Sequence, residues 1–543
     1  MKAYIVLLIM FFVLINNYSR SQDKIKDYDG IPIITYGYNI NNPHTFGNYN
    51  FTKMTDAGIF ALEVVDIDDN IYSDILSNTS LNIIPDQAGE SVLNYINYYT
   101  YGRYSKWEAE GTPETEGTAT LSNNITHTTI SNGSVITNSN NIPDGTILIS
   151  GPKYAQEVTY STLHTPIPYT ANFRLKLENI GFPLPQPTDV ICTLRVYCAK
   201  WAVVNDTSWE IVDDYYYDKV LRYSEFTSGW ENEILDYNLQ YAYDHFWSDP
   251  MPESMYRISK KNDNYVEYKF IEHVEFQVIW KGDESKVKLY TDNVTVYDDR
   301  GSTLIDGFAT SDITSQVTEL TNFKTKTAGW LSADEPYLID NYAPIKKVNE
   351  IIDAIPNNDA HLWIAFPGHW SGTYGDPGNL NLYLNQVYQI DEFMKRVKKA
   401  NIWMNCYMFN DPYDANFNPW PGGDWRVRNI NRIGELLYKK CNEANQYEGV
   451  DLYWGASVQT GKYYIYQEYP RYVKTNYVEI TSQQFLYTTN LALLYGAKLI
   501  SPWLYFGFID DPAGNDLWDY TGLANAQDQY QENYKYFTLK DTI

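Results

Sequence analysis

The sequence predicts an α/β fold, namely a (β/α)8 TIM barrel interrupted after its third βα unit by a jelly-roll-like β-sandwich. Three observations support this prediction. Apolar strands alternate with helices near both ends of the chain, there are three such strands before a break and five after it, and the segment in between has alternating strands separated by polar turns. Eight strands that alternate with helices are typical of a TIM barrel.

The eight expected strands are short apolar runs between amphipathic helices, a pattern typical of a parallel sheet buried on both faces. They fall within residues 31–39, 59–66, 81–87, 327–336, 361–368, 401–409, 449–459 and 498–508. An open doubly wound sheet is the alternative, but the glycine fingerprint expected after its first strand is absent.

The βα pattern stops near Gly111, where Ser/Thr/Asn-rich loops and alternating strands begin. Such strands with polar turns predict a sandwich or jelly roll. We therefore expect a first barrel part over 22–111, an inserted β-sandwich over 112–325 and a second barrel part over 326–543.

The N-terminus has the pattern of a cleavable signal peptide over residues 1–21. Lys2 precedes an apolar run from Ala3 to Ile15, and small residues follow at Ser19 and Ser21. The run is shorter than the ~20 residues of a membrane-spanning helix, although it could also be a buried strand. We expect a secreted or periplasmic protein without a membrane span.

Composition narrows the class of partner. A formal net charge of -27 argues against nucleic acid and anionic lipid, which require a basic face. Aromatic residues make up 16% of the chain, and flat aromatic rings stack on sugars, although tyrosine is also a favoured strand residue. The four cysteines do not form a disulfide framework, and buried free thiols are expected. The oligomeric state stays open.

Several motifs are absent. There is no HExxH, and the seven histidines have no ligand spacing, so no metal site is predicted. There is no GxSxG. The segment Gly455–Lys462 resembles a phosphate loop but is one residue too long, and Tyr463 follows where Ser or Thr belongs. No cofactor is expected.

The strongest candidate for chemistry is the segment Trp330-Leu331-Ser332-Ala333-Asp334-Glu335-Pro336. It is an apolar strand, the fourth of the barrel, that ends in paired carboxylates, and barrel chemistry takes place at the carboxyl ends of strands. We predict Glu335 as a general acid, shielded by neighbouring aromatic rings, with Asp334 assisting. The alternative is an acidic first turn of a helix.

The same segment, WLSADEP, resembles the strand-four acid/base segment of the β-galactosidase-like retaining (β/α)8 glycoside hydrolases. In that clan the Glu of the DEP triplet protonates the leaving oxygen, which implies this role for Glu335. Residues 480–508 resemble the helix and last strand of related glycosidases, and the insert resembles a carbohydrate-binding jelly roll. The resemblance implies a carbohydrate substrate.

The chain departs from that clan at strand seven, where the clan carries a nucleophilic Glu. Here the strand ends in Gln459, and Asp451 stands at its other end. Retention of configuration needs two carboxyls ~5–5.5 Å apart. The acids left as replacements, each of which also fits an ordinary loop or helix cap, are Asp411, Glu468, Glu479, Asp510 and Asp511.

Polar and aromatic residues near strand ends fit a sugar cleft, although barrel cores also use large apolar side chains. The predicted substrate-binding residues are Gln459, Trp370, Tyr407, Trp454, Trp503 and Tyr505. The sequence thus predicts a secreted glycosidase acting on a poly- or oligosaccharide. The alternative is a non-catalytic carbohydrate-binding or surface-attachment protein on a degenerate barrel, which the missing strand-seven acid favours.

Overall fold

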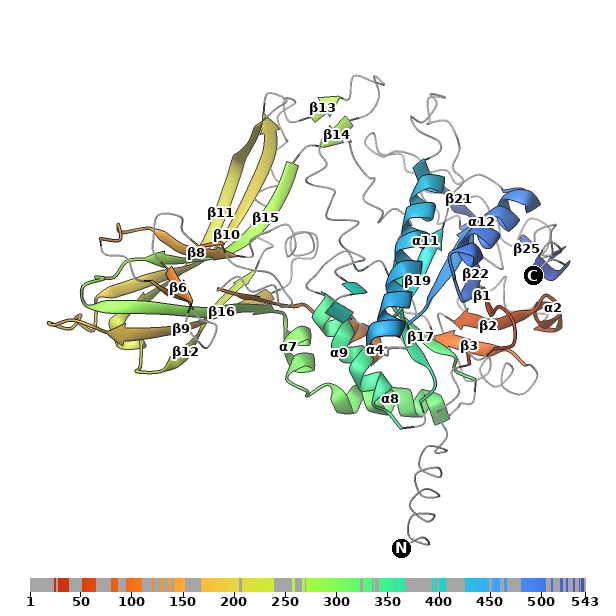
Figure 1. Ribbon diagram of the computed structural model, residues 1–543, viewed down its shortest axis with the longest axis horizontal. Coiled ribbons are helices and arrows are strands. Elements are labelled where there is room, and N and C mark those ends of the chain that lie inside the picture. Colours follow the sequence, from red (N-terminus) through yellow and green to blue (C-terminus); the bar gives the residue numbers. More distant parts are fainter. Residues whose placement is uncertain are drawn as a thin grey trace, which may run out of the picture. The chain divides into compact units, whose positions relative to one another are not determined.

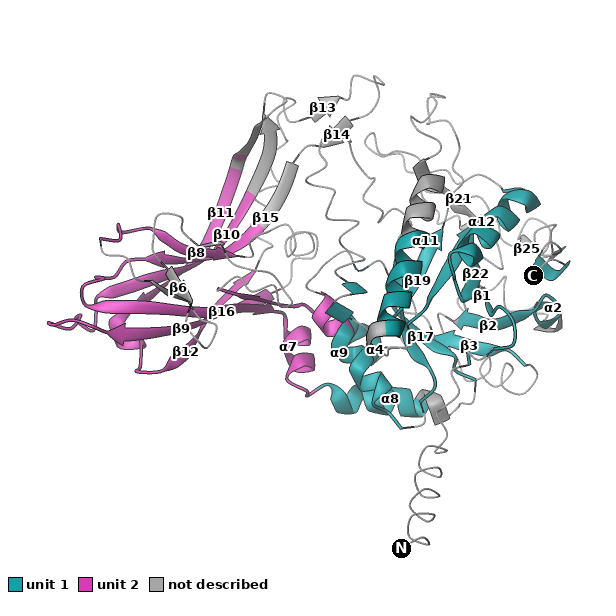
Figure 2. Ribbon diagram, in the orientation of Figure 1, with its two compact units in different colours: residues 1–100, 309–336, 346–543 teal, residues 101–308, 337–345 magenta. Residues whose placement is uncertain are grey.

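The computed structural model divides into two compact units (Figure 2). Unit 1 comprises residues 1–100, 309–336 and 346–543, and unit 2 comprises residues 101–308 and 337–345. The structure describes residues 24–25, 28–38, 51–64, 80–85, 94–109, 120–121, 127–129, 135–137, 141–151, 168–204, 208–238, 256–258, 266–268, 270–322, 326–334, 336, 341–356, 358–366, 393–394, 396–397, 400–406, 425–448, 452–459, 463–465, 480–503, 509–510, 518–520, 524–525, 531–532, 537 and 539–541. The predicted signal peptide lies outside them.

Unit 1 is built on an eight-stranded parallel sheet in the order β17-β18-β19-β20-β22-β1-β2-β3. Its strands are β1 (Ile33–Tyr38), β2 (Ile59–Val64), β3 (Asn82–Pro85), β17 (Gly329–Asp334), β18 (His361–Phe366), β19 (Asn401–Cys406), β20 (Trp454–Gln459) and β22 (Leu499–Trp503). All eight coincide with the strands expected from the sequence. Each is a short apolar run because both of its faces are covered.

The two ends of this sheet are joined to each other. Ile83 of β3 forms a parallel bridge to Thr327, just before β17, with hydrogen bonds of 2.8 Å from the Ile83 amide to Lys326 and from the Ala328 amide to Ile83. The sheet therefore closes into a TIM-like barrel. The expected pairing of the third strand with the fourth, across the interruption, is confirmed.

The inside of the barrel is filled by one apolar cluster, whose members apart from Ile25 come from each of the eight strands or from the residue just before the strand. These residues are Ile25, Ile34, Phe60, Ala61, Ile84, Ala328, Leu331, Trp363, Ala365, Trp403, Tyr453 and Leu499. The rings of Trp363 and Trp403 meet edge to face with centroids 6.0 Å apart. On the neighbouring strand β20, Gly455 pairs with Trp403, and a Cβ at Gly455 would lie 2.5 Å from Leu499.

Among the described residues, the α-helices of unit 1 are α2 (Phe51–Asp56), α4 (Asn94–Thr100), α8 (Thr310–Asn322), α11 (Trp425–Glu443) and α12 (Ser482–Leu494), together with most of α9 (Tyr342–Asp353). Figure 1 shows α11 and α12 alongside the parallel strands. α12 begins where a capping box satisfies its first amides, with Thr481 and Gln484 each accepting from the other's backbone. Among the described residues, no helix has both the length and the apolar character needed to cross a membrane.

Unit 2 contains two large antiparallel sheets, of five and six described strands. The five-stranded sheet has the order β11-β10-β15-β8-β5, formed by β11 (Ser208–Arg222), β10 (Val190–Val204), β15 (Phe270–Trp280), β8 (Ile147–Gly151) and β5 (Thr120–Leu121). The six-stranded sheet contains β12 (Trp230–Asn238), β9 (Pro168–Asn179), β16 (Val287–Tyr297), β7 (Val135–Thr137), β6 (His127–Thr129) and β4 (Tyr104–Glu108). Both contribute to one core, in which Trp107 and Tyr237 of the second sheet contact Phe276 of the first.

The range predicted as all-β, 112–325, differs from the structure at both ends. β4 already belongs to the six-stranded sheet before residue 112, and α7 (Asp299–Ile305) and α8 are helices inside the range. α7 begins because Asp298 accepts a hydrogen bond of 2.7 Å from the Gly301 amide. α8 is held by a hydrogen bond of 2.9 Å from the Ile96 amide to Gln316, which the local sequence does not reveal.

The four cysteines are free and buried, as the sequence predicted. Short antiparallel pairs complete the described strands: β13 (Tyr256–Ile258) with β14 (Val266–Tyr268), β21 (Tyr463–Ile465) and β23 (Ile509–Asp510) with β24 (Trp518–Tyr520), and β25 (Ala524–Asn525) with β26 (Gln531–Glu532).

Candidate active site at the carboxyl ends of the barrel strands

Two predicted substrate-binding residues end neighbouring strands. Gln459 is the last residue of β20 and Trp503 is the last residue of β22, and the two are paired in register. Paired residues of parallel strands share a face of the sheet. Gln459 is 3% exposed. The structure therefore brings these two residues together at the carboxyl edge of the barrel, where chemistry takes place in this fold.

Just below them, the inner face of the barrel turns from apolar to polar. Ser457 pairs with Ser501 on one side and with Asn405 on the other, and all three lie two residues beyond members or register partners of the apolar cluster. The Ser501 hydroxyl is buried and makes no hydrogen bond within the part of the chain that the structure describes. Hydroxyls and amides on this face could bind a polar ligand entering from the strand ends.

β17 carries a bulge immediately before the paired carboxylates. Its register with β18 shifts between Leu331 and Asp334, and Ala333 within the bulge has φ 57°. A non-glycine residue in the left-handed region is uncommon, and bulges occur next to active sites, where they redirect a side chain. Asp334 ends the strand, and its register partner is Ala365 of β18.

The bulge is held by side chains on the opposite face of β17. The indole of Trp330 donates a hydrogen bond of 3.1 Å to the Ala360 carbonyl, and the hydroxyl of Ser332 donates one of 2.7 Å to Asn97 of α4. Trp330 and Ser332 are both fully buried. The conformation leading to Asp334 is therefore fixed by packing and by hydrogen bonds.

Sequence reasoning missed one acid. Glu63, the next-to-last residue of β2, is 6% exposed and pairs in register with Ile84, a member of the apolar cluster. It therefore lies on the inner face of the barrel. Among the side chains that the structure describes in unit 1, it is the one buried carboxylate. The sequence feature that could have identified Glu63 is its position as the single acid in the otherwise apolar run IFALEVV.

Trp454 does not join Gln459 and Trp503. It is the first residue of β20, at the opposite end of the strand from Gln459, and is 2% exposed. Its indole donates a hydrogen bond of 3.1 Å to the Tyr495 carbonyl, directly after α12. These contacts give Trp454 a packing role between strand and helix.

Other predicted residues lie outside the described ranges. These are Glu335, Trp370, Tyr407 and Tyr505, together with the candidate acids Asp411, Glu468, Glu479 and Asp511. Asp510 ends β23, a strand paired with β24 away from the barrel sheet.

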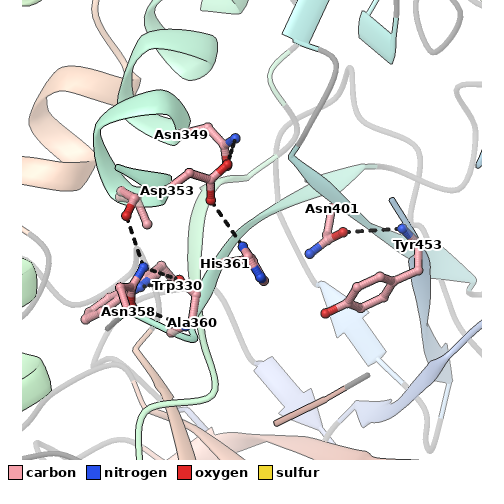
Figure 3. Close-up of polar contacts among 9 residues, drawn as sticks. Trp330, Asn349, Asp353, Asn358, Ala360, His361, Asn401 and Tyr453 are labelled. Atoms are coloured by element: carbon pink, nitrogen blue, oxygen red, sulfur yellow. Dashed lines mark hydrogen bonds and ion pairs between the residues drawn. The ribbon is translucent and has the colours of Figure 1, made fainter. Parts of the chain in front are cut away.

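The opposite, amino-terminal end of the barrel has polar contacts of its own (Figure 3). The side-chain amide of Asn358 donates a hydrogen bond of 2.9 Å to the Ala360 carbonyl, which also accepts one from the Trp330 indole. Nδ1 of His361 lies 3.1 Å from a carboxylate oxygen of Asp353. These residues fix the turn from α9 into β18. Because chemistry in this fold takes place at the other end, we assign them to stability.

Within the described ranges there is no group of three or more His, Cys, Asp or Glu side chains placed to hold a metal ion.

No family model and no curated protein matches the chain. Solved structures similar to it include the CBM22-1–GH10 modules of endo-1,4-β-D-xylanase 10B from Clostridium thermocellum complexed with xylohexaose, at 9% identity and TM-score 0.23, covering 82% of this chain and 95% of that chain. A glycosylation associate protein complex from Streptococcus agalactiae matches at 9% identity and TM-score 0.18, covering 87% and 93%. A family two carbohydrate esterase from Cellvibrio japonicus matches at 6% identity and TM-score 0.14, covering 66% and 89%. At these TM-scores the alignments define neither a fold nor a function.

Proposed function

We propose that the chain is an exported glycoside hydrolase-like protein that acts on a poly- or oligosaccharide, with Glu335 as general acid/base. The observation that carries the proposal is the bulge in β17, where Ala333 at φ 57° directly precedes Asp334 and Glu335. A residue held in this conformation costs of order 1–3 kcal/mol, and such strain concentrates at functional sites. Its location at the carboxyl end of a barrel strand supports a catalytic role for the acids that follow.

In this proposal Glu335 donates its proton to the glycosidic oxygen while the bond to the sugar breaks. Asp334 assists by hydrogen bonding or by its charge. Gln459 offers an amide that can both donate to and accept from sugar hydroxyls, and Trp503 offers a flat ring beside it. The register pairing of Gln459 with Trp503 supports their sharing one sugar.

The second carboxylate of this proposal is one of the strand-end and loop acids Asp411, Glu468, Glu479, Asp510 and Asp511. Glu63 acts in support, as a buried carboxyl group on the inner face of the barrel. The separation between the attacking carboxylate and Glu335 decides the stereochemistry, because inverting enzymes leave room for a water between the two groups.

We extend the proposal to the rest of the chain. The two antiparallel sheets of unit 2 are a jelly-roll-like sandwich inserted after the third βα unit, with a carbohydrate-binding role. Residues 1–21 are a cleaved signal peptide, which directs the protein to the periplasm or the exterior.

A second candidate is a non-catalytic carbohydrate-binding protein. The observation that favours it is Gln459 at the end of β20, the seventh strand, where the resembling hydrolases carry a nucleophilic acid. In that case the strand-end residues hold a sugar without cleaving it.

The experiment is a hydrolysis screen of the purified protein on neutral oligosaccharides and aryl glycosides, comparing wild type with Glu335→Gln. Glutamine keeps the shape but has no transferable proton. Hydrolysis should fall by about 10²–10⁴-fold, with sugar binding retained. An activated aryl glycoside, whose leaving group needs no protonation, should lose much less in the bond-breaking step.

The matched control is Glu350→Gln, the same substitution at an exposed position of α9, which should leave hydrolysis unchanged. A folded Glu335→Gln protein with full activity would refute the assignment. A wild type that binds sugars and hydrolyses none would instead support the binding-protein candidate.

A further inference from the structure

The five-stranded sheet of unit 2 has one apolar face and one polar face. On β10, Leu194, Val196 and Cys198 belong to the core of the unit. Strand residues alternate between the two faces, so Arg195 and Tyr197 lie on the other side. We call this side the polar face and define it by Arg195, Tyr197, Asp214, Tyr216, Asp218, Glu275 and Gln277.

The register of the strands gathers these residues into rows. Arg195 of β10 pairs with Asp218 of β11 and with Gln277 of β15. Tyr197 pairs with Tyr216 and with Glu275 on the same two strands. Because the paired residues share a face, aromatic rings, carboxylates, an amide and a guanidinium lie side by side.

Arg195 organises one part of the polar face. Its Nε and a terminal nitrogen donate hydrogen bonds of 2.7 and 2.8 Å to the two oxygens of Asp218, a bidentate geometry that fixes the guanidinium plane. The same guanidinium lies over the ring of Tyr216, 4.0 Å from its centroid. Tyr216 is nevertheless 51% exposed. The cation therefore holds the ring from one side and leaves much of it open to solvent.

Hydrogen-bonding groups flank this ring. The Tyr197 hydroxyl donates a hydrogen bond of 3.1 Å to Asp214. Ser150 and Gln277 donate hydrogen bonds of 2.7 and 3.1 Å to the same oxygen of Glu275. Burial, together with the neighbouring Asp214 charge, raises the pKa of Tyr197 to about 12, so its hydroxyl stays a donor at neutral pH. A carboxylate has about four acceptor positions, so exposed Asp214 can accept further hydroxyls beside Tyr216.

We propose that the polar face along β10 and β11 binds a neutral saccharide, with Tyr216 stacking on a sugar ring and Arg195, Asp214 and Asp218 binding its hydroxyls. The side chains of the polar face favour a saccharide over other ligands for the following reason. A half-open aromatic ring beside charged groups of both signs suits a ligand with an apolar ring face and many hydroxyls. A polyanion is disfavoured, because the formal net charge is -27 and this face carries three carboxylates to one guanidinium.

The inference shares with the proposed function the expectation of a carbohydrate ligand, but it uses residues of unit 2 alone. The test is affinity electrophoresis of the full chain through gels containing xylan, mixed-linkage β-glucan, galactomannan or galactan, with alginate as the polyanion. At least one neutral polysaccharide should retard the wild type. Tyr216→Ala should weaken that retardation by about tenfold or more, the loss typical of a central aromatic contact.

Tyr216→Phe, which keeps the ring, should bind within about threefold of wild type, because stacking and not the hydroxyl carries the contact. The matched control is Tyr487→Ala, which removes a tyrosine 47% exposed on α12 of the barrel and should change nothing. Arg195→Lys keeps the charge but loses the bidentate geometry, so it should weaken binding even if Tyr216→Ala folds poorly.

Three results would overturn the inference: no retardation by any neutral polysaccharide, retardation by alginate alone, or Tyr216→Ala and Arg195→Lys proteins that both bind like wild type. Failure of the proposed function looks different. A chain that binds through Tyr216 but hydrolyses nothing lacks the catalytic activity and keeps the polar-face site. A chain that hydrolyses sugars and binds them independently of Tyr216 and Arg195 has the catalytic activity but lacks the polar-face site.

Discussion

The hydroxyl of Ser332 donates a hydrogen bond of 2.7 Å to Oδ1 of Asn97, and both side chains are buried. Ser332 belongs to β17, the first barrel strand after the sheets of unit 2 in the sequence. Asn97 belongs to α4, the last described barrel helix before them. The bond therefore joins the two parts of the barrel. Ser332 is also the residue before Ala333, so the hydrogen bond anchors the chain next to the bulge that precedes Asp334.

Ser332→Ala should destabilise the barrel. The substitution leaves the Asn97 oxygen buried without this donor, a change that typically costs ~1–3 kcal/mol. Urea unfolding followed by tryptophan fluorescence measures the loss. The control is Ser302→Ala on α7, whose hydroxyl bond to Asp299 is exposed, with an expected cost within about 0.5 kcal/mol. Equal stabilities of the two variants would contradict the role of the Ser332–Asn97 bond.

Ala333→Val should destabilise the protein by more than the added volume of two methyl groups alone would cause. The left-handed conformation costs an L-residue roughly 1–2 kcal/mol, and a branched Cβ fits it worst. Ala333 is also 1% exposed, so the added methyls have little room. Ala333→Gly removes the strain and should stay within about 1 kcal/mol of wild type. Thermal unfolding of the three proteins distinguishes these outcomes, and a valine variant as stable as the glycine one would contradict the backbone assignment.

The barrel could be predicted from the sequence because its strands are covered on both faces. Runs such as HLWIAF and NIWMNC are mainly apolar on both faces, which separates them clearly from the amphipathic helices between them. The helix α8 was not predicted, because its sequence lacks such a clear apolar pattern. Its segment TSDITSQVTELTN is rich in Ser and Thr, which compete with helical hydrogen bonds. The helix is completed by contacts with α4 through Gln316 and Asp312, distant partners that local patterns do not reveal.

The candidate site was predictable only where a residue ends a strand. Gln459 and Trp503 were expected at strand ends, and register pairing brings them together. Trp454 was placed in the site as an aromatic residue of the same strand, but strand seven begins at Trp454, which puts the residue at the other end. Glu63 has no motif around it, because its significance comes from facing the barrel interior.

Glu63→Gln should lower hydrolysis and move the alkaline limb of the pH–activity profile to lower pH. An ionised Glu63 would favour the protonated form of the proposed general acid across the barrel interior. A general acid must be protonated to act, so removing that charge would narrow the active range from the alkaline side. Initial rates between pH 4 and 9 measure the shift. The isosteric change preserves packing. An unchanged profile together with full activity would show that Glu63 has no influence on the site.

The cysteines should be unreactive in the folded protein. All four are buried, and burial raises the pKa of Cys406 and Cys441 to about 12, so few thiolates exist at pH 8. Ellman's reagent should label fewer than about one thiol per native chain and all four after denaturation in guanidinium chloride. Rapid labelling of native protein would contradict the buried positions.

The bridge between Ile83 and Thr327 also has a consequence for the order of folding during synthesis. About 240 residues separate these positions, and ribosomes add ~5–20 residues per second, so β3 waits roughly 12–50 seconds for its neighbour. Until then its edge is unpaired, and unpaired edges recruit other chains. Within unit 2 the strand β4 also waits, since Tyr104 pairs with Tyr297 of β16 about 190 residues later, roughly 10–40 seconds at the same rate. The barrel nevertheless waits longer, because Ile33 of β1 pairs with Ile500 of β22 only after about 470 further residues, so its strand edges stay unpaired for the longest time.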